Sequence, residues 1–351
     1  MIKKSSLIAI LILILLFAWP AKYIDHFFYR PIASSVSIKS FKVYPGEPTD
    51  SVILRLKAEK IIHHPFLFNI ISQILSEKQK LNFGEYQITS STTPIKLLQN
   101  MISGTGLVQH KITFIEGWTV ENIRAALTAD VNLKQTIEKT NNQSIASLFE
   151  SNAPKSAEGL FYPDTYFFTW QNTDISVLKT AFAKMQSVLN QAWKNREPNL
   201  PYQTPYQALI VASLIQRETA VEAEKPIIAS VIINRLKKNM RLQIDPTVQF
   251  GLNKTFKDVI TQKDLETKTP YNTYLISGLP PTPICMPSKS AIIAALNPAQ
   301  TNYLYYVANG LGGHVFSETY AEHLKAVEQY YQKENNAKKF FNHLENSLGK
   351  L

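Results

Sequence analysis

The segment YQALIVASLIQRETA, residues 206–220, constrains the fold more than any other stretch of the chain. It predicts a helix with almost no solvent-facing side from Ala208 to Ile215, and such a helix belongs in the interior of a domain. The helix nevertheless delivers a carboxylate, Glu218, at its far end. Because desolvation disfavours a charged carboxylate, Glu218 could stay protonated near neutral pH and serve as a general acid. The structural alternative is a glutamate that leaves the apolar face and meets water or Arg217.

A second apolar stretch lies near the N-terminus. No charged residue occurs from Ser5 to Ala21, a length at the lower end of what spans a bilayer, and Lys3 and Lys4 precede it. We expect a cytoplasmic N-terminus at 1–4, a transmembrane anchor at 5–23 and an extracytoplasmic remainder. A cleaved signal peptide is the alternative, but no A-x-A-like cleavage site follows the stretch.

The composition narrows the class of protein. At 351 residues and 45% hydrophobic, the chain can form more than one domain. Cys285 is the only cysteine and the histidines are scattered, so we expect no disulfide framework, no metal and no cofactor. The net charge is +10, but the basic residues are dispersed. An anionic membrane surface or wall polymer is therefore favoured over nucleic acid, with simple solubility as the alternative.

The first external module is expected at 36–104. Alternation and turn residues predict, in order, a strand, two helices, a strand and a helix ended by Gly104, which together make a small α+β module. A connecting segment at 105–153 should hold a strand, VQHKITF, and a helix capped by Thr119.

A larger mixed α+β domain is expected at 154–335, before a basic tail at 336–351. Its predicted elements are helices at 175–194, 226–239 and 318–334, the buried helix, a hairpin at 304–317 and a strand at 240–246. That strand, MRLQIDP, would place Arg241, Gln243 and Asp245 on one face. Asp245 followed by proline is also a common way to open a turn.

Several motifs occur in the order found in one family. They are FIEGW, GLFYPDTY, the run ASLIQRETAVEAEKPIIASVIINRLKKNMRLQIDPTVQFG, then YNTY, GLPPTPI and YLYYVANGLGGHVF. With these motifs nearly the whole chain resembles the YceG-like family of endolytic murein transglycosylases. Thr282 stands where a glycine is common in the family, which puts the local loop shape in doubt but not the chemistry.

The resemblance implies a single-pass protein of the bacterial inner (plasma) membrane whose first external module is LysM-like. It implies that Glu218 is the single catalytic acid/base of a lytic transglycosylase, a lyase that cleaves the MurNAc–GlcNAc bond of nascent glycan strands and leaves 1,6-anhydroMurNAc ends. Such cleavage would end strand elongation. The partners would be peptidoglycan glycan strands, the inner membrane and the peptidoglycan synthases.

Other residues are candidates for binding the substrate, although a structural role suits each of them equally well. Gln243 and Asp245 could bind sugar or position the attacking hydroxyl, and the cleft could be lined by Tyr271, Asn272, Tyr274 and His314. Two alternatives stay open for the function. One is a muramidase that hydrolyses the same bond, with Asp245 activating water, and the other is a non-catalytic scaffold that binds the cell wall.

Overall fold

The computed structural model describes residues 24–32, 39–75, 80–137, 140–149 and 154–332. The expected membrane segment at 5–23 and the basic tail at 336–351 lie outside these residues. Among the described helices, none is both long enough and apolar enough to cross a membrane.

The chain divides into two compact units. The first runs to Lys111 and also includes Asn132–Lys134 and Phe167–Asn172. The second comprises Ile112–Val131, Gln135–Tyr166 and the chain from Thr173 onward. The boundaries expected near 104 and 153 remain predictions, because compactness alone does not define evolutionary domains.

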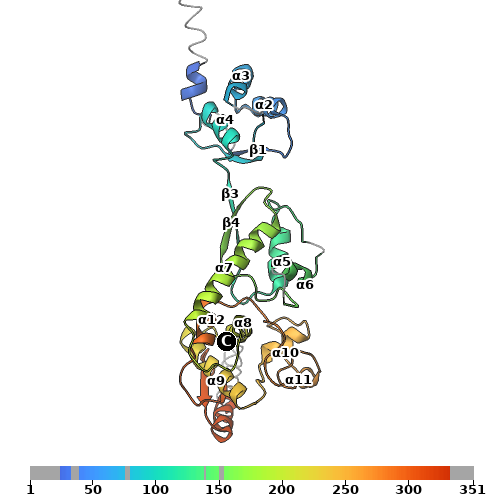
Figure 1. Ribbon diagram of the computed structural model, residues 1–351, viewed down its shortest axis with the longest axis vertical. Helices are drawn as coiled ribbons and strands as arrows, with labels where there is room; N and C mark the ends of the chain where they lie inside the picture. The colour runs from blue at the N-terminus through green and yellow to red at the C-terminus, as the bar shows by residue number, and fades with distance from the viewer. Residues whose placement is uncertain (1–23, 33–38, 76–79, 138–139, 150–153, 333–351) are drawn as a thin grey trace, which may run out of the picture. The chain divides into compact units, whose positions relative to one another are not determined.

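The first unit follows the expected order of strand, two helices, strand and helix. Its elements are β1 (Ser40–Val43), α2 (Thr49–Ala58), α3 (Pro65–Leu75), β2 (Gly84–Gln87) and α4 (Pro94–Ser103) (Figure 1). The two strands pair antiparallel, with Ser40 opposite Gln87. The helix α4 ends at Gly104, whose φ of 71° is left-handed and therefore suits glycine, as expected.

A pair of strands and two short helices come next. The strand β3 (Gln109–Thr113) pairs with β4 (Thr165–Thr169), and the boundary between the two units passes through both. Between them lie α5 (Val120–Ala129) and α6 (Asn142–Ser147). Thr119 caps α5 as predicted, and it does so within a reciprocal capping box with Asn122.

The centre of the second unit is the helix α8 (Pro205–Glu218), in which every side chain from Ala208 to Ile215 is buried, as predicted. The helices that pack against it, all labelled in Figure 1, are α7 (Asp174–Lys194), α9 (Lys225–Lys237), α10 (Asp245–Gly251) and α12 (Lys289–Leu296). A 3-10 turn, η2 (Glu222–Glu224), connects α8 to α9. The position of the carboxyl end of α8 is therefore fixed by the helices packed around α8 and not by a loop alone.

The prediction of a strand at 240–246 is wrong. Residues 240–244 have no regular structure, and Gln243 adopts a φ of 51°, which breaks an extended chain. The predicted alternation of burial is nevertheless correct, because Leu242 and Ile244 are buried while Arg241 and Gln243 are exposed. Asp245 is the first residue of a helix, in agreement with the turn-opening interpretation of the Asp-Pro pair.

The remaining elements complete the second unit. The helices α10 (Asp245–Gly251) and α11 (Gln262–Glu266) precede a long loop. The predicted hairpin is confirmed as β5 (Tyr305–Ala308) and β6 (His314–Ser317), which pair antiparallel with Ala308 opposite His314. A last helical segment covers 320–332.

Candidate active site

Glu218 is the last residue of α8, and the chain becomes extended at Thr219. The helix begins with a capping box between Thr204 and Gln207 and with Pro205 in its first turn, so its start is fixed by local sequence. Its apolar body then fixes the position of the carboxyl end. Glu218 itself is partly buried, and its charged form is poorly solvated. The partly buried carboxyl group of Glu218 is thus held at the point where the chain leaves the core.

Tyr306, on strand β5, donates a hydrogen bond from Oη to Glu218 Oε2 at 2.8 Å. Burial raises the pKa of Glu218 to about 7, while the hydrogen bond from Tyr306 opposes this shift. Burial also raises the pKa of Tyr306 well above its usual value, so the phenol remains a donor near neutral pH. Because Glu218 Oε2 accepts the hydrogen bond from Tyr306, the proton of the neutral carboxyl group would be carried by Oε1.

Asp245 lies near enough to Glu218 for its negative charge to raise the pKa of Glu218 further. Its Oδ1 accepts a hydrogen bond from Tyr274 Oη at 2.5 Å. The site therefore contains two carboxyl groups, each of which is bonded to a tyrosine. The difference is exposure, because Asp245 is an exposed residue whereas Glu218 is partly buried.

Arg235, on α9, organises the chain around these carboxyl groups. Its Nε donates to the Leu304 carbonyl at 2.6 Å, and its Nη1 donates to the Leu242 carbonyl at 2.9 Å and to Gln243 Oε1 at 3.1 Å. The guanidinium thus joins the irregular segment before α10 to the start of β5. Its charge also favours the ionised form of Glu218.

His314, on β6, is held by Glu224. The backbone N–H of His314 donates to Glu224 Oε1 at 2.8 Å, and its Nδ1 lies 2.7 Å from Oε2. The same carboxylate accepts a hydrogen bond from Thr219 Oγ1 at 3.1 Å. Since the ring of His314 packs edge-on against Tyr306, Glu224 links the end of α8 to the hairpin that carries Tyr306.

Tyr271 and Asn272 occupy structural positions. Asn272 has no exposed surface, and its amide donates to the carbonyls of Leu265 and Thr267 at 2.9 and 2.8 Å. Tyr271 Oη lies 2.8 Å from Thr282 Oγ1. These contacts favour the structural role that the sequence left open for both residues. The structure thus brings Gln243, Asp245, Tyr274 and His314 into the network around Glu218, and their roles in binding remain predictions.

Three members of this network were not predicted, namely Tyr306, Glu224 and Arg235. The sequence did offer a signal for Arg235, because it closely follows the apolar run Val231–Ile233 within a predicted helix, and a buried charge needs partners. Tyr306 lies within the YLYYVANGLGGHVF motif, but neighbouring tyrosines on a strand cannot be ranked without knowing which one faces α8.

Gly117, in the FIEGW motif, packs closely against the end of α8. Its φ of 79° is left-handed, and a Cβ there would lie 3.1 Å from Arg217 Nη1. Its backbone N–H donates to the Met286 carbonyl at 2.8 Å. Arg217 in turn stacks over the ring of Phe256, with 3.7 Å from Cζ to the ring centre. The motif therefore supports the turn of α8 that presents Glu218.

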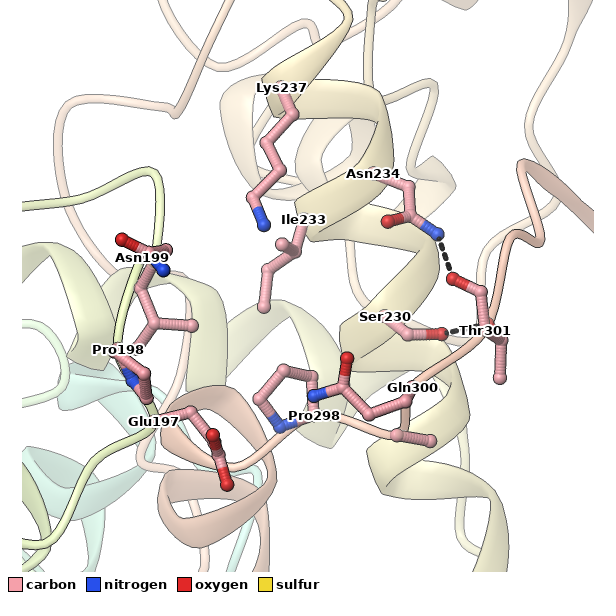
Figure 2. Close-up of a pocket in the computed structure, with 12 residues that line it drawn as sticks. Glu197, Pro198, Asn199, Ser230, Ile233, Asn234, Lys237, Pro298, Gln300 and Thr301 are labelled. Carbon is pink, nitrogen blue, oxygen red and sulfur yellow. Dashed lines mark hydrogen bonds between the residues drawn. The ribbon is translucent and has the colours of Figure 1, made fainter.

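A separate cavity of about 260 Å³ lies beside α9. In Figure 2, Ile233 and Lys237 extend from α9 toward this cavity, and Glu197 and Pro298 lie along its lower side. Its lining includes none of the residues grouped around Glu218, so we do not assign it to the candidate active site. Among the residues that the structure describes, no cluster of three or more His, Cys, Asp or Glu side chains could hold a metal ion.

Known proteins are similar to this chain in sequence and in fold. An endolytic murein transglycosylase of Bacillus subtilis (strain 168) is 34% identical over 267 residues, which cover 72% of this chain and 74% of the relative. A protein of the same name from Streptococcus pneumoniae serotype 2 is 26% identical over 315 residues, covering 81% of this chain and 56% of the relative. The crystal structure of a YceG-like protein from Listeria monocytogenes matches with a TM-score of 0.54 and 28% identity, over 82% of this chain and 98% of that one.

The family assignment rests on a match to the family as a whole. The sequence pattern of the YceG-like family matches residues 41–329, a range that runs from β1 to the last helical segment. It includes Glu218 together with Tyr306, Asp245 and Glu224. This chain belongs to the YceG-like family.

Proposed function

We propose that this protein is an endolytic murein transglycosylase, which cleaves the MurNAc–GlcNAc bond within peptidoglycan strands and leaves 1,6-anhydroMurNAc ends. The names of the relatives support the reaction class, and the family match supports its transfer to this chain. The observation that carries the proposal is Glu218, a carboxyl group of pKa about 7 fixed at the end of a buried helix.

The proposed reaction needs one carboxyl group. Protonated Glu218 donates its proton to the oxygen that links MurNAc to GlcNAc, and the bond from that oxygen to C1 of MurNAc breaks. The resulting carboxylate then takes the proton of the C6 hydroxyl as the oxygen of that group attacks C1. The 1,6-anhydro ring forms, Glu218 is protonated again, and no water is consumed. Because the nucleophile belongs to the substrate, no second carboxylate is needed, unlike in an ordinary glycosidase.

A pKa of about 7 suits both halves of this cycle. Near neutral pH both the protonated and the ionised forms of Glu218 are populated, so the group can donate a proton as the C1–O bond breaks and take one back as the C6 oxygen attacks. Tyr306 supports the second half, since its hydrogen bond stabilises the carboxylate that forms when the leaving group departs.

The test is mass spectrometry of peptidoglycan digested by the purified full-length protein, beside the variant Glu218→Gln. We expect internal cleavage with anhydroMurNAc ends, and loss of at least about a hundredfold in rate in the variant, the usual cost of removing a general acid. Reducing MurNAc ends would instead identify a hydrolase. Equal binding and function of both proteins without cleavage would identify a wall-binding scaffold.

Hydrolysis is the second candidate, and one observation favours it. Asp245 lies close enough to influence the pKa of Glu218 and could activate a water molecule if the two carboxyl groups flank the scissile bond. Its bond to Tyr274 Oη, at 2.5 Å, engages one of its two oxygens and leaves the other for water or substrate.

The location and the partners belong to the same proposal. The uncharged run from Ser5 to Ala21 after Lys3 and Lys4 supports a single membrane anchor with the enzyme on the outer side. The order β1, α2, α3, β2, with paired strands, supports a LysM-like first module. An anchored enzyme reaches only glycan near the membrane, where strands are made, so its natural partners are the peptidoglycan synthases and its effect is to end strand elongation.

A further inference from the structure

The helix α3 packs Phe68 into the core but exposes a second row of apolar side chains. Phe66 and Ile74 are 78% and 75% exposed, and Ile70 between them is 38% exposed. Their spacing of four residues places them on one face of the helix. Ser72, by contrast, is 1% exposed and satisfies its hydroxyl by donating to the Asn69 carbonyl at 2.8 Å. The helix is therefore apolar on its outer face as well as on its inner face, which is unusual for the surface of a soluble domain.

The exposed face also lacks charge. The sequence of α3, PFLFNIISQIL, contains no acidic or basic residue. The neighbouring helix α2 is different, since it carries Asp50, Arg55 and Lys57 within a similar length. A helix surface of Phe and Ile that carries no charge of its own suits an apolar partner rather than a polar glycan.

The helical segment at 24–29 joins α3 to the apolar run near the N-terminus. Phe27 is 2% exposed and its ring packs on Phe68 of α3, with 5.9 Å between the ring centres. The ring of His26 lies 5.3 Å from that of His63, just before α3. The next residues outward, Phe28 and Tyr29, are 39% and 75% exposed. Thus the chain that leaves the apolar run at Ala21 is packed within a few residues against the start of α3.

We propose that the exposed face of α3, together with Phe28 and Tyr29, lies in the headgroup region of the membrane that holds the anchor. This inference rests on the proposed membrane anchoring. The lipid surface is the favoured occupant because the anchor would bring it to this face, and because tyrosine and phenylalanine are suited to the boundary between headgroups and acyl chains. The first unit then touches the membrane surface directly and is not only linked to it through the anchor. We call this contact the seat.

In this seat, the apolar face binds lipid weakly and the anchor strengthens that binding. An apolar face of this size binds a bilayer reversibly by itself, whereas the anchor makes the event intramolecular and so raises the local concentration of lipid. The consequence for the proposed enzyme is a fixed orientation of the first unit relative to the membrane plane.

Depth-dependent quenching can test the seat in the full-length protein. Cys285 has no exposed surface, so a thiol-reactive fluorophore such as NBD will label an introduced cysteine selectively. The protein is reconstituted into vesicles of phosphatidylethanolamine and phosphatidylglycerol, with or without a lipid that carries a nitroxide on its acyl chain. The test position is Ile74→Cys. The matched control is Leu54→Cys on α2, an apolar residue of the same unit that is 66% exposed.

We expect a blue-shifted emission at position 74 and quenching by the nitroxide lipid roughly twofold or more above that at position 54. Equal quenching at the two positions would overturn the seat. So would a blue shift at position 74 that depends on protein density but not on nitroxide, since that result would mean a second copy or another protein covers α3.

Flotation of the same vesicles after an alkaline carbonate wash separates the seat from the anchor. Protein that floats without selective quenching at position 74 refutes the seat and keeps the anchor. Protein that does not float refutes both.

Discussion

Tyr306 and Glu218 are 88 residues apart in sequence, and their side chains share a hydrogen bond of 2.8 Å. The tyrosine comes from strand β5 and the glutamate from the end of α8, so the bond exists only when the hairpin is packed against the helix. The bond lowers the pKa of Glu218 while burial raises it, and the balance is a pKa of about 7. The hairpin therefore lowers a pKa that burial raises, in the group that the proposed reaction depends on.

The first prediction concerns Tyr306→Phe. Activity that requires protonated Glu218 should fall as the pH rises through about 7 in the wild type. Loss of the phenol removes an interaction that lowers the pKa, so the pKa of Glu218 rises and the fall in activity moves to higher pH, by roughly one unit. Release of anhydroMurNAc ends, measured from about pH 5 to pH 9, gives this profile.

The control for that experiment is Tyr303→Phe, a nearby tyrosine whose hydroxyl is not bonded to Glu218. Its profile should match that of the wild type. An unchanged profile for Tyr306→Phe, with only a uniformly lower rate, would show that the phenol holds the hairpin without tuning the acid.

The second prediction concerns Asp245→Asn. The negative charge of Asp245 raises the pKa of Glu218, so its removal should shift the fall in activity to lower pH, opposite to the shift expected for Tyr306→Phe. The products should still carry anhydroMurNAc ends, because the transglycosylase needs no second carboxylate. Mass spectrometry of the products separates the two mechanisms, since a hydrolase with Asp245 as its base would lose at least about a hundredfold in rate.

Local pattern was enough to predict the buried helix that ends at Glu218, whereas the role of Glu218 was expected only from the family resemblance. The apolar run in α8 can only be buried, and a helix has a defined last turn, so the position of the carboxyl group followed from periodicity and burial. The helix α7 and the capping residue Thr119 were predictable for the same reason, because their signals lie within a few neighbouring residues.

Other features depend on contacts that local pattern does not encode. The helix α12 packs directly on α8, yet it was missed, because KSAIIAAL is short, nearly all apolar and without helical periodicity. The segment 240–244 alternates like a strand but finds no strand to pair with. Arg235 holds its carbonyls instead, and the left-handed Gln243 turns the chain into α10.

The third prediction concerns the link between Glu224 and His314. Glu224→Gln keeps the size of the side chain but weakens its bonds to His314 and Thr219, which otherwise stabilise the charged carboxylate. We expect the hairpin that carries Tyr306 to loosen, so that kcat falls by roughly tenfold while KM changes little. Steady-state kinetics on isolated glycan strands give both constants.

Glu266→Gln is the matched control, because Glu266 is an exposed glutamate on α11 whose hydrogen bond to Gln262 lies on the surface. Its kinetics should equal those of the wild type. Parallel changes in kcat and in the alkaline limb of the pH profile would tie Glu224 to Tyr306, whereas a loss of thermal stability with normal kinetics would assign it to the fold alone.

The last prediction concerns a buried carboxyl group that the proposed reaction does not use. Glu158 is 2% exposed, and its two oxygens accept the backbone N–H of Val120 at 3.2 and 3.1 Å, at the start of α5. Burial raises its pKa from 4.5 to about 8. The folded state therefore holds this proton more tightly than the unfolded state does. Its contribution to stability is complete below about pH 4.5 and is lost as the pH rises toward 8.

Glu158→Gln should remove this pH dependence, because glutamine does not titrate and can still accept the N–H through its amide oxygen. Urea denaturation at about pH 5 and pH 8 should show a wild-type free energy of unfolding that falls by several kcal/mol between the two pH values, and a smaller fall in the variant. Glu266→Gln is the control, since Glu266 is an exposed glutamate of the same unit and is not among the groups that shift the pKa of Glu158. If Glu158→Gln and the wild type lose stability in parallel, other groups carry the dependence and Glu158 is ionised in the folded protein.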